Sequence, residues 1–139
     1  MKHNTIRTFI HSLLLKEFLE NFGGEYIFHG TNKGKALSIQ RDKFIKPFST
    51  GESKPSISFT KDWDYANYYA TSKGGNSNKT ILRTRLNSNF ELSSRIKDNS
   101  GYEYITFNPI PSSELEIYSF NDKSWHPLES WNVVFDEPL

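Results

Sequence analysis

The chain has 139 residues, enough for one hydrophobic core, and we expect a single domain over 1–139. Its 17 basic and 16 acidic side chains give a formal net charge of +1, which offers no electrostatic reason to expect binding to nucleic acid or a membrane surface. Because cysteine is absent, disulfides, thiol chemistry and cysteine-ligated metal sites are excluded.

The hydropathy of the chain argues against a membrane or secretory protein. No apolar run approaches the length of about 20 residues that a membrane helix needs. Met1 is followed by an amphipathic pattern, with no apolar signal-peptide core that ends in small residues. We therefore expect a cytoplasmic location, which is also compatible with delivery into another cell.

Residues 5–20 are expected to form a helix, because apolar side chains recur at the spacing of one helix face, as Ile6, Phe9, Ile10, Leu13 and Leu14. The segment 25–31 alternates like a strand, with His29 at or near its end. Gly30 lets a backbone or a ligand approach this strand closely.

Shorter elements are expected before residue 56. Residues 35–40 indicate a short helix with Ala36 and Ile39 on its inner side. The segment 44–48 is expected to be extended, and 49–55 is a loop by its composition.

The stretch 56–70 predicts a strand that runs directly into a helix. Ile57 and Phe59 alternate with polar residues, as in a half-buried strand. Thr60 or Asp62 is expected to cap the start of the helix.

One face of this helix carries Ala66, Tyr69 and Ala70, which follow the i, i+3, i+4 spacing. Two small residues beside an aromatic ring suit a face that leaves room for a flat ligand. The alternative is that Tyr69 is an ordinary core aromatic.

Residues 71–79 are polar and rich in glycine, and we expect the most mobile loop of the chain there. A strand is predicted over 80–86, with Ile81 or Leu82 facing inward. A short extended piece at 90–92 precedes a polar stretch at 93–101.

The C-terminal part adds strands at 102–107 and 115–120. The tail 121–139, which contains Trp125, Trp131 and the apolar run Val133-Val134-Phe135, is expected to carry one last strand. Together these elements predict an α+β fold, with mostly strands and a few short helices.

Glu103 is the carboxylate of greatest interest. Alternation along 102–107 places it on the same face as Ile105 and Phe107. A carboxylate on an apolar face is costly unless it is paired, so its position favours a functional role.

Other familiar sites find no support. His3, His11, His29 and His126 lie far apart in the sequence and show no metal-ligand spacing. The glycine-rich loops of Rossmann and P-loop nucleotide sites and the Gly-x-Ser-x-Gly elbow are also absent.

Three motifs, in this order, resemble those of the ADP-ribosyltransferases of the diphtheria-toxin and poly-ADP-ribose-polymerase branch, which carry a His-Tyr-Glu signature. The motifs are His29-Gly30-Thr31, then 57–60 with Ala66 and Tyr69, and then 103–108. The resemblance spans about residues 26–118. It implies a split β-sheet core that binds NAD over 25–120, with a few short helices and the N-terminal helix over 5–20.

The resemblance also implies roles for individual residues, with NAD as a substrate and no metal. Glu103 and His29 would be catalytic. Glu103 would bind the 2′-hydroxyl of the nicotinamide ribose and stabilise the cation that forms as nicotinamide leaves. His29, supported by Thr31, would bind a ribose hydroxyl of NAD, and the backbone of Gly30 would bind the nicotinamide amide.

The second motif departs from the family pattern, since the family's tyrosine falls on Ser58 and a serine cannot stack. The ring on the nicotinamide would then come from the following helix, which carries Ala66 and the candidates Tyr65, Tyr68 and Tyr69.

The segment Ser58-Phe59-Thr60 is similar to the Ser-Thr-Ser motif of the other major branch. In that branch, a carboxylate two positions before the catalytic glutamate activates an arginine acceptor. Gly101 stands at that position, so modification of arginine is disfavoured.

The function expected from the resemblance is NAD-dependent mono-ADP-ribosylation of a macromolecular acceptor. The near-neutral net charge favours a protein acceptor over nucleic acid. One alternative is a catalytically inactive relative that serves as a binding module. The other is an NAD-using RNA 2′-phosphotransferase, in which Arg83, Arg85, Lys33 and Lys35 would be the basic residues near the RNA phosphate.

The small size suits a bacterial or phage toxin or effector, and a toxin would imply a neutralising antitoxin protein. The segments 46–56 and 71–79 are the expected NAD lid and acceptor contacts, because they lie next to the second motif in the sequence.

Overall fold

The computed structural model describes residues 25–49, 54–93 and 103–139. The expected helix over 5–20, most of the polar stretch 93–101 and the centre of the loop 49–55 lie outside these residues.

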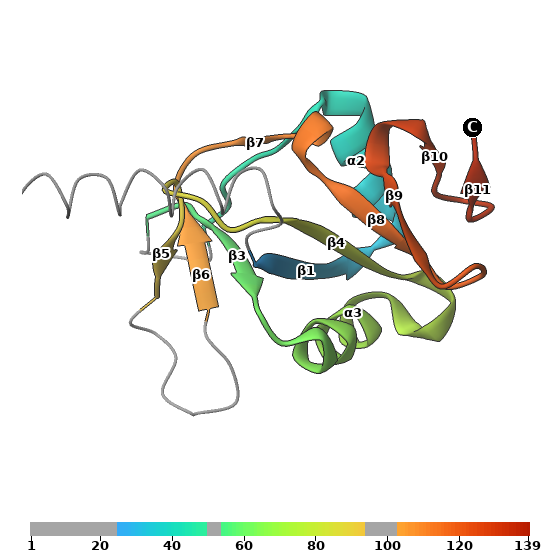
Figure 1. The fold of residues 1–139 in the computed structure, drawn as a ribbon, viewed down its shortest axis with the longest axis horizontal. Coiled ribbons are helices and arrows are strands. Elements are labelled where there is room, and N and C mark those ends of the chain that lie inside the picture. Colours follow the sequence, from blue (N-terminus) through green and yellow to red (C-terminus); the bar gives the residue numbers. More distant parts are fainter. Residues whose placement is uncertain (1–24, 50–53, 94–102) are drawn as a thin grey trace, which may run out of the picture.

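A seven-stranded antiparallel sheet forms the centre of the described chain (Figure 1). Its strands lie side by side in the order β5 (Glu91–Leu92), β6 (Glu103–Thr106), β3 (Ile57–Thr60), β1 (Tyr26–Asn32), β4 (Lys79–Arg85), β8 (Glu116–Ser119) and β9 (Ser124–Pro127). The mixture of this sheet with two α-helices, α2 (Lys33–Asp42) and α3 (Trp63–Asn78), confirms the predicted α+β class.

Smaller elements surround the sheet. Two short strand pairs are β2 (Phe44–Ile45) with β7 (Ile110–Pro111), and β10 (Trp131–Asn132) with β11 (Glu137–Pro138). Two single turns of 3-10 helix are η1 (Ser112–Glu114) and η2 (Leu128–Ser130).

The sheet is divided between β1 and β3. β1 pairs with β4 along its whole length, from Tyr26 opposite Arg85 to Asn32 opposite Lys79. With β3 it shares one register position, Phe28 opposite Thr60. Two half-sheets therefore meet at this position, and the rest of the boundary is not closed by strand pairing.

Both faces of the central strand β4 are covered. Leu82 is buried in the main core with residues from α2 and the C-terminal segment. Ile81 is buried on the opposite face, against Ala66 and Ala70 of α3. The sequence predicted that one of the two residues faces inward. Both are buried, because α3 covers one face of β4 and the main core covers the other.

Helix α2 follows the sequence expectation. The side chain of Asn32 caps it by accepting a hydrogen bond from the Lys35 backbone N–H at 2.9 Å. Ala36 and Ile39 are its buried residues, as the spacing predicts.

Helix α3 begins where the sequence indicates. The carboxylate of Asp62 accepts hydrogen bonds from the backbone N–H groups of Asp64 and Tyr65, at 2.9 and 3.3 Å. Thr60, the other candidate cap, accepts a bond from the Asp62 backbone N–H at 3.1 Å. The two candidates therefore act in succession.

The prediction of a loop over 71–79 is wrong, because α3 continues to Asn78 and β4 starts at Lys79. The helix is interrupted only at Gly75, where φ is 71°. A Cβ at Gly74 would lie 3.0 Å from the Asn32 side chain, so close packing on the start of α2 holds this segment. Such a tertiary contact is not visible in local composition.

Two further expectations are corrected. β1 runs on to Asn32, so His29 lies in the middle of its strand. The tail 121–139 carries three short strands, β9, β10 and β11, in place of the one expected, and its apolar run lies in the turn 133–136 between β10 and β11. Asp136 has a positive φ of 51°, and its carboxylate accepts a bond from the Trp131 indole, which bends the chain back.

Candidate active site

Ser58 connects the two residues that the sequence singles out as catalytic. The Nδ1 atom of His29 lies 2.8 Å from the backbone oxygen of Ser58. The hydroxyl of Ser58 donates a hydrogen bond to Oε1 of Glu103 at 2.5 Å. The three residues lie on the neighbouring strands β1, β3 and β6.

The register puts the side chain of Glu103 on the α3 side of the sheet, in one row with Thr60 and Phe28. His29 follows Phe28 and projects to the opposite side, where it packs on Phe59, so it reaches the backbone of Ser58 and not the Glu103 side of the sheet.

The hydrogen bond of His29 fixes its tautomer. A carbonyl oxygen can only accept, so Nδ1 carries the proton and donates it to Ser58. In the neutral ring Nε2 is then an acceptor. His29 can therefore receive a hydrogen bond from a hydroxyl group of a ligand.

The surroundings of His29 favour this neutral form. Burial, which penalises the charged ring, is the largest effect and lowers the pKa of His29 below its ordinary value. The bond to the Ser58 carbonyl acts in the opposite direction, and the positive charge of Lys35 lowers the pKa further. His29 is thus suited to accept from a hydroxyl at neutral pH.

Glu103 occupies the first position of β6, opposite Thr60 of β3. Directly opposite residues of an antiparallel pair project to the same side, as do residues two apart on one strand. Ser58 and Glu103 therefore share a side of the sheet, which explains the short contact between them. The hydroxyl orients the carboxylate in a fixed direction.

This role of Ser58 was not predicted from the sequence, because a serine in place of a tyrosine indicates only the loss of a stacking ring. The available signal was the similarity of Ser58-Phe59-Thr60 to the Ser-Thr-Ser motif. A hydroxyl at that position can bind the carboxylate of the neighbouring strand.

Gly30 is next to His29, but its missing side chain has a second explanation. A Cβ at Gly30 would lie 2.3 Å from the backbone oxygen of Ala66 and 2.9 Å from the backbone nitrogen of Ala70. The space beside Gly30 is therefore filled by α3. Thr31 is buried, and it shares the His29 side of β1 by alternation.

The expectation that Ala66 and Ala70 leave room for a flat ligand is corrected by the same packing. Both residues are buried against β1 and β4, so their small size serves the close approach of α3 to the sheet. Ala66 is consequently removed from the predicted ligand-binding set.

The three candidate tyrosines lie on α3 with exposed fractions of 49% for Tyr65, 71% for Tyr68 and 43% for Tyr69. Since successive residues of a helix are about 100° apart, Tyr65 and Tyr69 project from one flank and Trp63 from the other. Trp63 contacts Tyr118 of β8 and Trp125 of β9. The flank with Tyr65 and Tyr69 therefore faces the β3 and β6 side of the sheet, whereas Tyr68 points outward.

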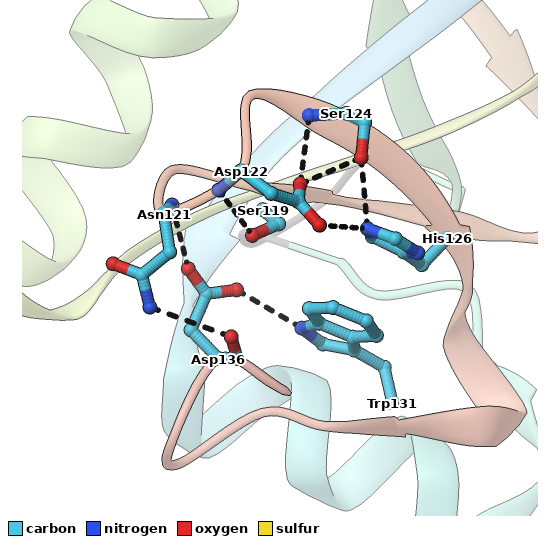
Figure 2. Close-up of polar contacts among 7 residues, drawn as sticks. All are labelled: Ser119, Asn121, Asp122, Ser124, His126, Trp131 and Asp136. Atoms are coloured by element: carbon cyan, nitrogen blue, oxygen red, sulfur yellow. Dashed lines mark hydrogen bonds and ion pairs between the residues drawn. The ribbon is translucent and has the colours of Figure 1, made fainter. Parts of the chain in front are cut away.

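A second polar cluster at the β8–β9 turn resembles a catalytic triad in composition (Figure 2). The Nε2 atom of His126 lies 2.7 Å from Oδ2 of Asp122 and 2.9 Å from Oγ of Ser124. A triad needs the acid and the nucleophile on different ring nitrogens. Because both contact the same nitrogen, this cluster is a hydrogen-bonded turn and not a nucleophilic site.

Other kinds of site find no support in the described part of the chain. Within it, no group of three or more His, Asp or Glu side chains could hold a metal ion. A shallow polar depression of about 380 Å³ is lined by Asn32, Gly34, Lys73, Gly74 and Asn78, none of which belongs to the candidate active site. None of the described helices has the length and apolar character to cross a membrane.

Comparisons with known protein families, with curated proteins and with solved structures gave no match to this chain. The case for function therefore rests on the motifs and the geometry above.

Proposed function

We propose that the protein is an NAD-dependent mono-ADP-ribosyltransferase, which releases nicotinamide and transfers ADP-ribose to a macromolecular acceptor. The observation that carries this proposal is the hydrogen bond from the hydroxyl of Ser58 in the second motif to Glu103 in the third, with His29 of the first motif bonded to the backbone of Ser58. Residues of the three motifs, from His29 to Glu103, which is 74 positions further along the chain, lie on three neighbouring strands. The partial separation of β1 from β3 supports the split-sheet fold that the resemblance implies.

Glu103 supplies the electrostatic part of the reaction. As the bond between C1′ of the ribose and nicotinamide breaks, positive charge develops on the ribose. A carboxylate whose direction is fixed by Ser58 stabilises that charge without reorganising. The ring of Tyr65 or Tyr69, on the same side of the sheet as Glu103, covers the nicotinamide. His29 supports the site from the opposite side, by holding the backbone oxygen of Ser58.

The decisive experiment measures NAD binding by calorimetry and nicotinamide release by the purified chain. We expect Glu103→Gln to bind NAD but to release nicotinamide at least 100-fold more slowly, as is usual when a group that stabilises transition-state charge is removed. The matched control is Glu114→Gln, since Glu114 is an exposed glutamate of η1 away from the site.

Three outcomes separate the alternatives. Release that depends on Glu103 supports the transferase. Binding without release, even when cell lysate and labelled NAD are added, favours an inactive binding module. If the chain does not bind NAD, both the transferase and the inactive NAD-binding module are contradicted.

The cellular role is proposed by analogy with the family and not from the geometry of the site. A small transferase of this kind would act as a bacterial or phage effector, and as a toxin it would need a neutralising protein. Co-purification of the catalytically inactive Glu103→Gln protein with a partner encoded beside it would test this role.

A further inference from the structure

The half-sheet that carries Glu103 has an apolar rim on the side opposite that carboxylate. Leu92 of β5 lies opposite Tyr104 of β6, which is buried in the main core, so Leu92 projects to the side of the main core. The side chain of Leu92 lies open to solvent, since the residue is 57% exposed. Leu86 and Phe90 are partly buried against the same core. We define the apolar rim as Leu86, Phe90 and Leu92.

The described helices pack elsewhere on the sheet. α3 covers the other side, where Ala66 and Ala70 are buried against Ile81. α2 lies on the side of the apolar rim, but it packs on β1, β2 and β4, and β5 and β6 lie apart from it (Figure 1). β5 is also an edge strand of the seven-stranded sheet, and natural proteins commonly protect such an edge with a helix or a loop.

The chain enters the sheet beside the apolar rim. Glu25 precedes β1, and its backbone oxygen accepts a hydrogen bond from the backbone N–H of Leu86 at 2.8 Å. Its carboxylate forms an ion pair with Lys61 at 2.7 Å, and Lys61 lies 5.3 Å from the ring centre of Tyr104. Residues that precede Glu25 are therefore attached to the sheet at the apolar rim.

We propose that the amphipathic segment 5–20, which lies outside the described residues, packs on the apolar rim as a helix. The spacing of its apolar residues from Ile6 to Leu14 places them on one helix face. A short helix in water gains most of its stability when such a face is covered by another apolar surface. The apolar rim supplies that surface within the same chain, and the inference does not depend on the transferase function.

The length of the chain before Glu25 permits this packing. A helix over 5–20 is about 24 Å long. Residues 21–24 link it to Glu25 and, when extended, bridge at most about 17 Å. β5 lies three strands from β1, which is about 14 Å at the usual spacing of neighbouring strands. The segment is therefore long enough to run from Glu25 across β3 and β6 to Leu92.

This packing joins the two half-sheets. Leu86 follows β4 in one half-sheet, whereas Leu92 belongs to the other. The two halves share only one register position, Phe28 opposite Thr60. A helix that contacts both Leu86 and Leu92 is a second connection between the halves, on the side of the sheet opposite Glu103.

The test uses the full chain, which contains no cysteine, so that introduced thiols are the only ones present. One cysteine is introduced by Phe9→Cys or Leu13→Cys, one helical turn apart on the apolar face, and a second by Leu92→Cys. A short bismaleimide reacts with both thiols, and mass spectrometry follows the rate at which the intramolecular cross-link forms.

The matched control uses Glu91→Cys in place of Leu92→Cys. Both residues are exposed neighbours on β5, and they project to opposite sides of the sheet. We expect the cross-link to form at least about tenfold faster with Leu92→Cys at one or both positions of the segment, because only that side chain lies on the rim side.

The outcomes are distinct. A cross-link that favours Leu92→Cys supports the inference. Equal rates with Leu92→Cys and Glu91→Cys overturn it, because a segment that is not docked meets both sides of the edge strand. Absence of an intramolecular cross-link also overturns it, as do cross-links between two chains, which would show that a second copy covers the apolar rim. A melting temperature for each variant verifies that the protein is folded, and the result is independent of NAD binding.

Discussion

The hydroxyl of Ser58 illustrates how a single side chain determines what the candidate site can do. It stands where a stacking tyrosine is expected, yet it binds Oε1 of Glu103 at 2.5 Å. A bond of a hydroxyl to a carboxylate is charge-assisted, which makes it shorter and stronger than a bond between neutral groups. At the residue scale, the departure from the family pattern is thus compatible with an ordered catalytic carboxylate.

Replacing Ser58 by alanine should slow nicotinamide release by roughly 10- to 100-fold, since a hydrogen bond to a charged group contributes about 1.5–3 kcal/mol. NAD affinity should change little, because Glu103 acts mainly on the charge that forms in the transition state. Steady-state kinetics check both quantities. Ser113→Ala, an exposed serine of η1, is the control, and an unchanged kcat in Ser58→Ala would contradict the orienting role.

His29 predicts a pH dependence of stability. Burial lowers its pKa in the folded protein below the ordinary value of 6.5, so the unfolded chain binds a proton at a higher pH than the folded one. The free energy of unfolding should therefore fall as the pH decreases below about 6.5, by about 1.4 kcal/mol for each unit by which the pKa is lowered.

Urea denaturation between pH 7.5 and 5 would measure this effect in the wild type and in His29→Gln, whose side chain does not titrate. The variant should lose less stability over this range. Parallel pH profiles of the two proteins would show that His29 is not the responsible group.

At the scale of elements, the contact between α3 and β1 is set by one glycine. The backbone of α3 occupies the space where Gly30 would carry a Cβ, and Ala66 and Ala70 are small enough to permit that approach. The same helix carries Tyr65 and Tyr69 on its flank, so its distance from the sheet also sets the position of the candidate stacking rings.

Gly30→Ala should destabilise the protein by about 3 kcal/mol, because the new methyl group meets backbone atoms that can move only with the whole helix. Gly34→Ala is the matched control. Its nearest neighbour would be the Asn32 side-chain oxygen at 3.4 Å, and alanine favours the helix, so its stability should stay equal or rise by about 0.5–1 kcal/mol. Equal losses for both variants in urea denaturation would contradict the packing argument.

At the scale of the whole molecule, the C-terminal segment is tied to the edge of the sheet by polar contacts (Figure 2). Asp136 accepts hydrogen bonds from the indole Nε1 of Trp131 and from the backbone N–H of Asn121, both at 3.0 Å. The ring of Trp131 stacks on His126 of β9, with centres 3.8 Å apart. The turn after β8, the strand β9 and the chain end therefore support one another.

Asp136→Ala should lower the free energy of unfolding by about 1–3 kcal/mol, because it leaves the part-buried indole N–H without its partner. Far-ultraviolet circular dichroism and tryptophan fluorescence should follow one coincident transition in urea, as expected if the segment folds with the sheet. Glu137→Ala, exposed on β11, is the control. A fluorescence transition that precedes the loss of secondary structure would show that the segment folds separately.

The sequence by itself determined most of the local structure. Alternation located β1, β3, β4, β6 and β8, and the capping chemistry at Asp62 located the start of α3. The α+β class followed from the order of these elements. Local patterns suffice here because side-chain alternation and caps depend on neighbours within a few residues.

Only the tertiary structure decided which residues meet. The bond from Ser58 to Glu103, the use of Gly30 by α3 and the burial of Ile81 and Leu82 on opposite faces all depend on strand register or helix packing. The failed loop prediction over 71–79 has the same origin, since Gly74 is held against Asn32, 42 positions away by the numbering. These contacts join segments distant in sequence, and their energies depend on which strands pair and not on the composition of either segment alone.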